Sequence, residues 1–242
     1  TSARHLSTLR RFYKFLLAER IRDDDPSNGL DSPKLTKSLP KFLTEFEVDR
    51  LLEAAHNRTG ADGLRISALM EILYAAGLRV SELVGLPLSA LSRDRQLLTF
   101  RGKGNKEREV SVSDAMLEAL KRYRLSRGLP PLPAPGESTP LIHKTRGKGG
   151  ITSTRQIRGI VQHCFTRAAS KMKEEGFSEE ADRLETATVH WLRHTGISED
   201  VKIRPREHVR DDAGHGSSAI TDRYIDVERA ERHASAKLKT VR

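Results

Sequence analysis

The sequence predicts a mainly α-helical protein with one small antiparallel β-sheet, an α+β fold. Apolar residues recur at helical spacing over most of the chain. Only two short runs, QLLTF and REVSVS, are rich in β-branched and apolar residues, and a glycine-containing turn separates them. At 242 residues the chain is long enough to bury a substantial core. We therefore expect one large domain, or one domain with a small companion.

The first expected helix covers residues 3–21 and is amphipathic and basic. Its apolar residues recur three and four positions apart, while arginines and lysines occupy the remaining surface. Such a helix can bury one face and offer the other to phosphate groups, although a solvated charged face fits the pattern equally well. Residues 23–43 then hold three prolines, a glycine and several Ser, Asp and Asn residues, which is typical of a linker. We place a domain boundary near residue 40.

The elements after the linker follow from local signals. Thr44 and Glu47 form a capping-box pattern, so a helix is expected from about residue 45. A second helix should cover 62–76, and the two β-type runs should form a hairpin with Lys103 near its tip. The remaining helices are expected at 114–126, 152–174, 178–185 and 188–201, the last interrupted before Pro205, with an extended proline-rich loop at 128–140.

The charge balance favours a partner that carries phosphate groups. The chain has 43 Lys and Arg against 33 Asp and Glu, a formal net charge of +10 spread along its length. That distribution is typical of nucleic-acid binding, although a merely soluble basic protein would also show it. The candidate DNA contacts are Arg10, Arg11, Lys14 and Lys106.

The single cysteine is consistent with a reducing compartment, and the hydropathy indicates no membrane span. Cys164 is the only cysteine, which excludes a disulfide within the chain and a paired-cysteine metal site. Apolar runs fall well short of the roughly 18 to 20 residues that a membrane span needs. We expect a cytoplasmic protein with no membrane partner.

Several short segments contain residues suited to holding a phosphodiester. Arg79 lies in an apolar neighbourhood with Glu82 one helical turn later, so the carboxylate can hold a guanidinium that matches two phosphate oxygens. An ordinary ion pair explains this pattern as well. Lys103 lies between glycines in the hairpin turn, where its ammonium could donate a proton to a leaving oxygen, although exposed turn lysines are common.

The C-terminal half adds histidines, an arginine and a tyrosine. His190, Arg193 and His194 lie at i, i+3 and i+4 on one helix face, which is either a catalytic face or an ordinary helix surface. The pair of histidines lacks the acidic third ligand of a zinc protease, so we expect no metal. His215 follows Gly214, and Tyr224 lies nine residues later. A phenol with a pKa of about 10 needs cationic neighbours to become a nucleophile at neutral pH.

These motifs resemble those of the tyrosine recombinases, also called the phage integrase family, and most closely its Xer-type members. The likeness runs from about residue 3 to 228. It covers the segments DDPSNGLDSPKLTKSLPKFLTEFEVDRLL, GLRVSELVGL and GKGNKEREV, the H-x-L-R-H-T box, the G-H box and the terminal tyrosine. Each motif is modest alone, but their order and spacing together make the resemblance specific.

The resemblance implies a reaction that needs neither a metal ion, nor another cofactor, nor ATP. Two arginines would bind the non-bridging oxygens of the scissile phosphate, Lys103 would protonate the departing 5′ oxygen, and two histidines would assist proton transfer. Tyr224 would attack to give a 3′-phosphotyrosyl link, which the 5′ hydroxyl of another strand can resolve through a Holliday junction. The implied catalytic set is Arg79, Lys103, His190, Arg193, His215 and Tyr224, supported by Glu82.

The sequence departs from the family pattern in two places. Between Arg193 and His215 the family usually carries an apolar segment, whereas this chain is charged there, with Pro205 inside and Ala213 where leucine is usual. This bears on how His215 is positioned, and His194 and His208 are the substitutes to consider. At the N-terminus, residues 1–40 are expected to be the C-terminal part of a helical core-binding domain plus linker, and residues 41–242 the catalytic domain with a C-terminal tail.

The resemblance also implies partners. They are a double-stranded recombination site and further recombinase subunits, in a homo- or heterotetramer contacted through the C-terminal tail, although a solvated basic tail fits equally well. A type IB topoisomerase would share the same chemistry but would relax DNA without a defined partner site. Two further hypotheses are a non-catalytic DNA-binding descendant, which the intact catalytic set argues against, and an unrelated basic binding module, which leaves the joint spacing unexplained.

Overall fold

The computed structural model describes residues 2–33, 41–58, 60–92, 96–102, 105, 107–131, 134, 137–144 and 146–214. The chain forms two compact units, Thr1–Leu39 and Pro40–Arg242. No helix of the described residues is long and apolar enough to cross a membrane.

The first unit contains a single described helix, α1 (Ser2–Ala18). It ends before residue 21 because Arg20 adopts a left-handed conformation with φ of 56°, which an α-helix cannot continue through. Arg10 donates to the carbonyl oxygen of Leu30 at 2.6 Å and to Oγ of Ser32 at 2.9 Å, so its guanidinium holds the segment that follows the helix. On the apolar side Leu6 is buried, whereas Phe12 is exposed.

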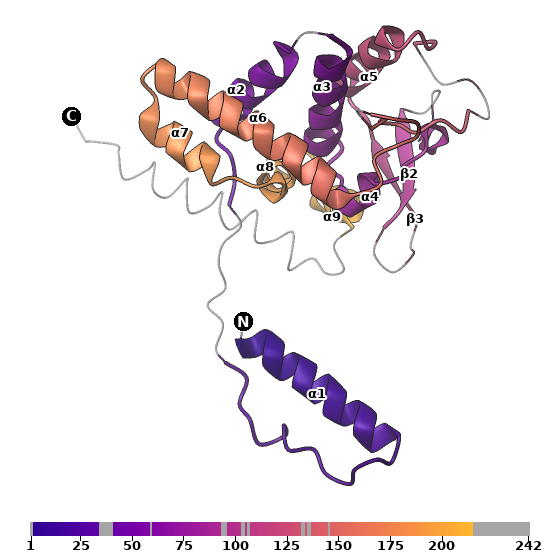
Figure 1. Ribbon diagram of the computed structural model, residues 1–242, viewed down its shortest axis with the longest axis vertical. Helices are drawn as coiled ribbons and strands as arrows, with labels where there is room; N and C mark the ends of the chain where they lie inside the picture. The colour runs from indigo at the N-terminus through magenta and orange to yellow at the C-terminus, as the bar shows by residue number, and fades with distance from the viewer. Residues whose placement is uncertain are drawn as a thin grey trace. The chain divides into compact units, whose positions relative to one another are not determined.

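The second unit is built around α3 (Gly60–Ala75), whose middle residues are almost all buried. The helices α2 (Glu45–His56), α5 (Asp114–Ser126) and α8 (Val189–Ile203) pack against it, and α6 (Thr154–Glu174) and α7 (Ser178–Glu185) complete the helical layer (Figure 1). The predicted capping box is present, because Thr44 Oγ1 accepts from the backbone of Glu47 and the Glu47 carboxylate accepts from Thr44.

A small sheet lies at one end of the helical layer (Figure 1). Its antiparallel order is β1 (Leu91–Ser92), β2 (Leu97–Arg101) and β3 (Glu107–Ser111), so the predicted hairpin gains a third short strand. Leu98 pairs with Val110 and Phe100 with Arg108, and the apolar members of these pairs are buried. The α+β fold class is therefore confirmed.

The last described elements form a helix–turn–helix. In this motif α8 is followed by α9 (Arg206–Ala213). Earlier in the chain, two short helical turns precede the sheet, α4 (Val80–Leu83) and the 3-10 turn η1 (Leu88–Ala90). Pro205 stands just before α9, where its missing N–H is not needed. Ile197, Val209 and Ala213 form a small apolar cluster that holds α9 against α8. This packing places the C-terminal end of α9 beside β3 (Figure 1).

Candidate active site

Arg79 and Glu82 form a fixed pair at the start of α4. Nη1 of Arg79 donates to Oε1 of Glu82 at 2.7 Å, and the backbone N–H of Arg79 donates to Oε2 of the same carboxylate at 2.7 Å. The Glu82 side chain is 3 % exposed, whereas that of Arg79 is 30 % exposed. A buried carboxylate thus fixes a guanidinium that still reaches the surface.

Arg193 approaches the same place from α8. This residue is only 6 % exposed, and its Nη2 donates to the carbonyl oxygen of Ala213 at 2.5 Å. Nη2 of Arg79 lies 3.3 Å from that oxygen and 3.4 Å from the carbonyl oxygen of Gly214. Two guanidinium groups from distant parts of the chain therefore converge on the C-terminal end of α9.

Arg108 on β3 is a third guanidinium at this site, and sequence patterns do not single it out. Its Nη2 lies 3.5 Å from Oε2 of Glu82, and its guanidinium carbon lies 4.8 Å from the centre of the Phe100 ring. Burial lowers the pKa of Arg108, and the charge of Arg79 acts in the same direction, against the opposing effect of Glu82. One signal could have identified it, because side chains alternate along a strand and Arg108 shares its face with the buried Val110.

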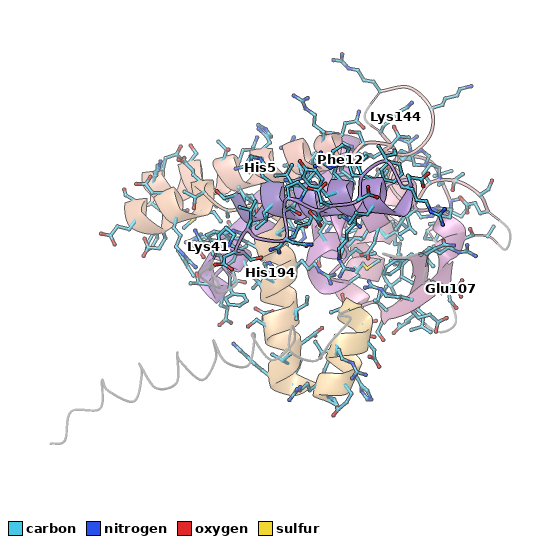
Figure 2. The ribbon with its side chains drawn as sticks, turned by 90° about the horizontal axis from the view of Figure 1, so that it is seen from below. His5, Phe12, Lys41, Glu107, Lys144 and His194 are labelled. Carbon is cyan, nitrogen blue, oxygen red and sulfur yellow. The ribbon has the colours of Figure 1, made fainter. Side chains whose placement is uncertain are left out.

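The two histidines of α8 have different surroundings. His190 is exposed one turn before Arg193. Although the residue is exposed overall, the protein around it still removes part of the imidazole's hydration. This desolvation, followed by the charges of Arg158, Arg193 and Arg79, lowers the pKa of His190, so the neutral ring is favoured. His194 instead packs edge to face against Phe42, with ring centres 6.4 Å apart, near Lys41 (Figure 2).

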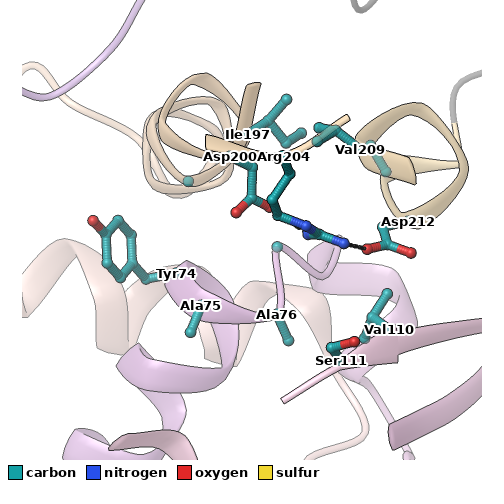
Figure 3. Close-up of a pocket in the computed structure, with 13 residues that line it drawn as sticks. Tyr74, Ala75, Ala76, Val110, Ser111, Ile197, Asp200, Arg204, Val209 and Asp212 are labelled. Atoms are coloured by element: carbon teal, nitrogen blue, oxygen red, sulfur yellow. Dashed lines mark hydrogen bonds and ion pairs between the residues drawn. The ribbon is translucent and has the colours of Figure 1, made fainter. Parts of the chain in front are cut away.

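Arg204, at the junction of α8 and α9, forms ion pairs with both helices, an arrangement we call the arginine clasp. Arg204 donates to Oδ2 of Asp200 at 3.0 Å and also pairs with Asp212 on α9 (Figure 3). These groups line a cavity of about 30 Å³ between α3, β3 and α9, a space suited to one water molecule. The acidic and basic residues that depart from the family pattern therefore anchor α9.

Helix α9 ends at a glycine cap. Gly214 caps α9 in the left-handed conformation, with φ of 59° and ψ of 45°.

The family model described as the phage integrase family matches residues 41–231. The chain belongs to the phage integrase family.

The relatives of this family member include Xer-type enzymes from several bacteria. A tyrosine recombinase XerD of Caulobacter vibrioides is 41 % identical over 162 residues, which cover 67 % of this chain and 53 % of the relative. A tyrosine recombinase XerD of Oceanobacillus iheyensis is 32 % identical over 236 residues, which cover 95 % of this chain and 72 % of the relative. The chain thus spans about half the length of the Caulobacter relative.

The fold matches solved structures of several recombinases and integrases. A variant of the Tn1549 transposon integrase, solved in complex with a circular intermediate DNA, superposes with a TM-score of 0.66 at 19 % identity, covering 96 % of this chain and 78 % of the integrase. At this identity the likeness shows the fold alone.

Four of the predicted residues lie outside the described residues. These are Lys103, Lys106, His215 and Tyr224. Two of them directly follow described glycines that lie close to the site. A Cβ built at Gly102, before Lys103, would lie 3.2 Å from Oε1 of Glu82, and Gly214, before His215, lies against Arg108. Gly102 thus lies beside the Glu82 carboxylate, and Gly214 lies beside the guanidinium of Arg108.

The basic residues predicted to contact DNA from α1 lie together in the first unit. Arg10, Arg11 and Lys14 line one hollow of about 370 Å³. Arg11 and Lys14 are exposed, whereas Arg10 is half-buried by its bonds to the following segment. Within the described ranges, no group of three or more His, Cys, Asp or Glu residues is arranged to hold a metal ion.

The environment of His194 predicts an acid-dependent loss of stability. Burial, with the nearby His190 and Arg193, lowers the pKa of His194 from 6.5 to about 4. The unfolded chain takes up this proton first, so the contribution of His194 to stability is complete above pH 6.5 and is lost as the pH falls towards 4. We expect His194→Gln to make the fall in unfolding free energy across this range shallower, measured by urea titration at several pH values.

The control for this measurement is His163→Gln, which alters an exposed imidazole on α6. An equal change in slope for both variants would show that His194 has no special part in the acid response.

Proposed function

We propose that this chain is the catalytic part of a site-specific DNA recombinase or integrase, which cleaves and rejoins DNA through a 3′-phosphotyrosyl intermediate and a Holliday junction. The observation that supports this most strongly is the convergence of Arg79 and Arg193 on one carbonyl oxygen, that of Ala213. A carbonyl at a helix C-terminus carries partial negative charge, and we take it as a stand-in for a non-bridging phosphate oxygen, which the same two guanidinium groups would bind.

The chemistry follows from this arrangement. In the transition state, negative charge on the non-bridging oxygens of the phosphate would meet two guanidinium forks, the buried one of Arg193 and the one that Glu82 fixes. Tyr224 would attack the phosphorus, and Lys103 would give a proton to the departing 5′ oxygen. His190, favoured in its neutral form, and His215 would accept and return protons at the phosphate.

The phosphotyrosyl ester keeps the energy of the broken phosphodiester. A 5′ hydroxyl from a second strand can therefore attack the ester, release the tyrosine and restore the backbone without ATP. Cationic side chains of this chain supply the charge stabilisation that metal ions give to other phosphoryl-transfer enzymes.

The partner of this reaction is a double-stranded recombination site, bound by a tetramer whose subunits touch through their C-terminal tails. The Tn1549 integrase and the recombinase XerH, both of which share the fold, have been solved in complex with DNA. Residues 1–40 would be the end of a core-binding domain and 41–242 the catalytic domain, which acts with the DNA in the prokaryotic cytoplasm.

Covalent trapping tests the proposal directly. The protein is incubated with nicked suicide duplexes that carry candidate recombination sites, and the mixture is resolved on a denaturing gel. We expect an adduct with the unchanged protein and none with Tyr224→Phe, because the substitution removes the attacking hydroxyl. Tyr13→Phe, which changes a tyrosine on α1, should leave the adduct intact.

Two outcomes would contradict the proposal. An unchanged protein that forms no adduct is not this kind of enzyme, and an adduct that survives Tyr224→Phe assigns the nucleophile to another residue. Relaxation of plasmids that lack any recombination site would indicate topoisomerase activity instead.

A further inference from the structure

Arg108 shares the carboxylate that fixes Arg79. Oε1 of Glu82 accepts from Nη1 of Arg79, while Oε2 accepts from the Arg79 backbone and lies 3.5 Å from Nη2 of Arg108. The side chain of Arg108 is 11 % exposed, and that of Glu82 is 3 % exposed. One buried carboxylate is thus shared by two guanidinium groups, with the longer contact made by Arg108.

Arg108 also carries donors that nothing in the described structure uses. Its Nε and Nη1 are buried and have no hydrogen-bond partner within the described residues. A buried donor without a partner costs free energy, so Nε and Nη1 contribute nothing that keeps this guanidinium in place. Its stacking on Phe100 and the nearby charges of Glu82 and Asp212 are the favourable contacts.

The position of Arg108 links three segments that carry predicted catalytic residues. It contacts Glu82, which belongs to the same helical turn as Arg79. A Cβ built at Gly102 would lie 3.7 Å from Nε of Arg108, and one built at Gly214 would collide with its Nη1. These glycines directly precede Lys103 and His215 in the sequence. Arg108 therefore lies where the hairpin, α4 and the end of α9 meet.

We propose that Arg108 is a positioning residue of the phosphate site, which holds Glu82 and thereby the guanidinium of Arg79 for the non-bridging oxygens of the scissile phosphate. This inference rests on the proposed recombinase function. Arg108 is largely buried against Glu82 and Gly214 and would not touch the phosphate itself, so its effect on the reaction would pass through Arg79. Its positive charge also offsets the buried carboxylate, which would otherwise attract Arg79 alone and weaken its charge towards phosphate.

The test compares cleavage of three suicide duplexes by Arg108→Gln. On the ordinary phosphate we expect a loss of about 10²-fold in cleavage rate, the size that misplacement of a positioned group typically causes. On a methylphosphonate, where a neutral methyl replaces one non-bridging oxygen, the clamp is needed less and the difference from the unchanged protein should shrink. On a 5′-bridging phosphorothiolate, whose thiolate leaves without an acid, the loss should persist.

The control variant is Arg101→Gln, an exposed arginine on the neighbouring strand β2, which should cleave the phosphate at the unchanged rate. Arg108→Lys keeps the charge without the planar fork and should fall between Arg108→Gln and the unchanged protein. It also provides a folded variant if Arg108→Gln has a much lower melting temperature.

Three results would overturn the inference. They are a normal rate for Arg108→Gln on phosphate, an equal loss on phosphate and methylphosphonate, which indicates a purely structural role, and recovery on the phosphorothiolate, which places Arg108 with the leaving group. A failure of the unchanged protein to cleave any duplex would instead overturn the recombinase proposal, and the inference with it.

Discussion

Arg193→Ala is expected to reduce the rate of covalent adduct formation by about 10²- to 10³-fold while leaving most of the DNA affinity intact. The guanidinium of Arg193 is buried and directed at the place where we expect a phosphate oxygen, so its loss removes charge stabilisation of the transition state. Binding depends instead on many of the 43 lysines and arginines and should keep its steep salt dependence. Gel assays of adduct formation and salt titrations of binding measure the two effects separately.

Arg167→Ala is the matched control, because it removes an exposed arginine from α6. It should slow adduct formation little. If Arg193→Ala lowers binding and cleavage together while its melting temperature stays unchanged, the clamp is wrongly assigned.

Glu82→Gln should destabilise the second unit and slow cleavage at the same time. Its carboxylate is almost fully buried between Arg79 and Arg108, and a neutral amide removes the counter-charge that the two cations share. Breaking a buried pair typically costs roughly 3–5 kcal/mol, and we expect about 3 kcal/mol because Arg79 is partly exposed to solvent. Urea unfolding of the whole chain gives the stability change, and adduct formation gives the rate.

The contrasting substitution is Glu118→Gln on α5, whose pair with Lys121 is exposed. Exposed pairs contribute about 0 to 1 kcal/mol, so this variant should unfold almost like the unchanged protein. Similar unfolding midpoints for the two variants would mean that Glu82 does not hold buried charge.

The helices are predictable wherever capping and periodicity agree. The helix at Asp114–Ser126 has the predicted bounds, and Ser113 caps it by accepting from the backbone of Met116. The first helix is shorter than predicted because its periodic pattern continues past Arg20, where the backbone turns left-handed. Strand β1 escapes prediction, since two residues are too few to show alternation.

Helix α9 escapes prediction for a different reason. Its sequence is strongly charged and follows a proline, which suggests an interruption of α8. In the structure Pro205 starts a new helix, and only Val209 and Ala213 need to be apolar to pack on α8. Among the charged residues of α9, Asp212 pairs with Arg204, which also pairs with Asp200 on α8, and Arg210 pairs with Asp211.

The sequence predicts the contacts between neighbouring residues of the site, but not the meeting of residues that are far apart in the chain. Spacing alone indicates that Arg79 and Glu82 share a helical turn, and the structure contains that pair. The meeting of Arg79 with Arg193 depends on how α4, α8 and α9 pack, which no local pattern encodes. Arg108 is easily overlooked because a charged residue in a short strand is usually assigned to the solvent face. The catalytic roles of Lys103, His215 and Tyr224 stay predictions, and so do those of Arg79, His190 and Arg193.

The double hold of Glu82 on Arg79 has a consequence for binding. A free arginine side chain has about 2 kcal/mol of rotamer entropy, and ordering it on a ligand normally subtracts from affinity. Here one carboxylate grips both the backbone N–H and the guanidinium of Arg79 before any DNA arrives. Most of that disorder is therefore removed during folding, so under the proposed function Arg79 would meet the phosphate already preorganised.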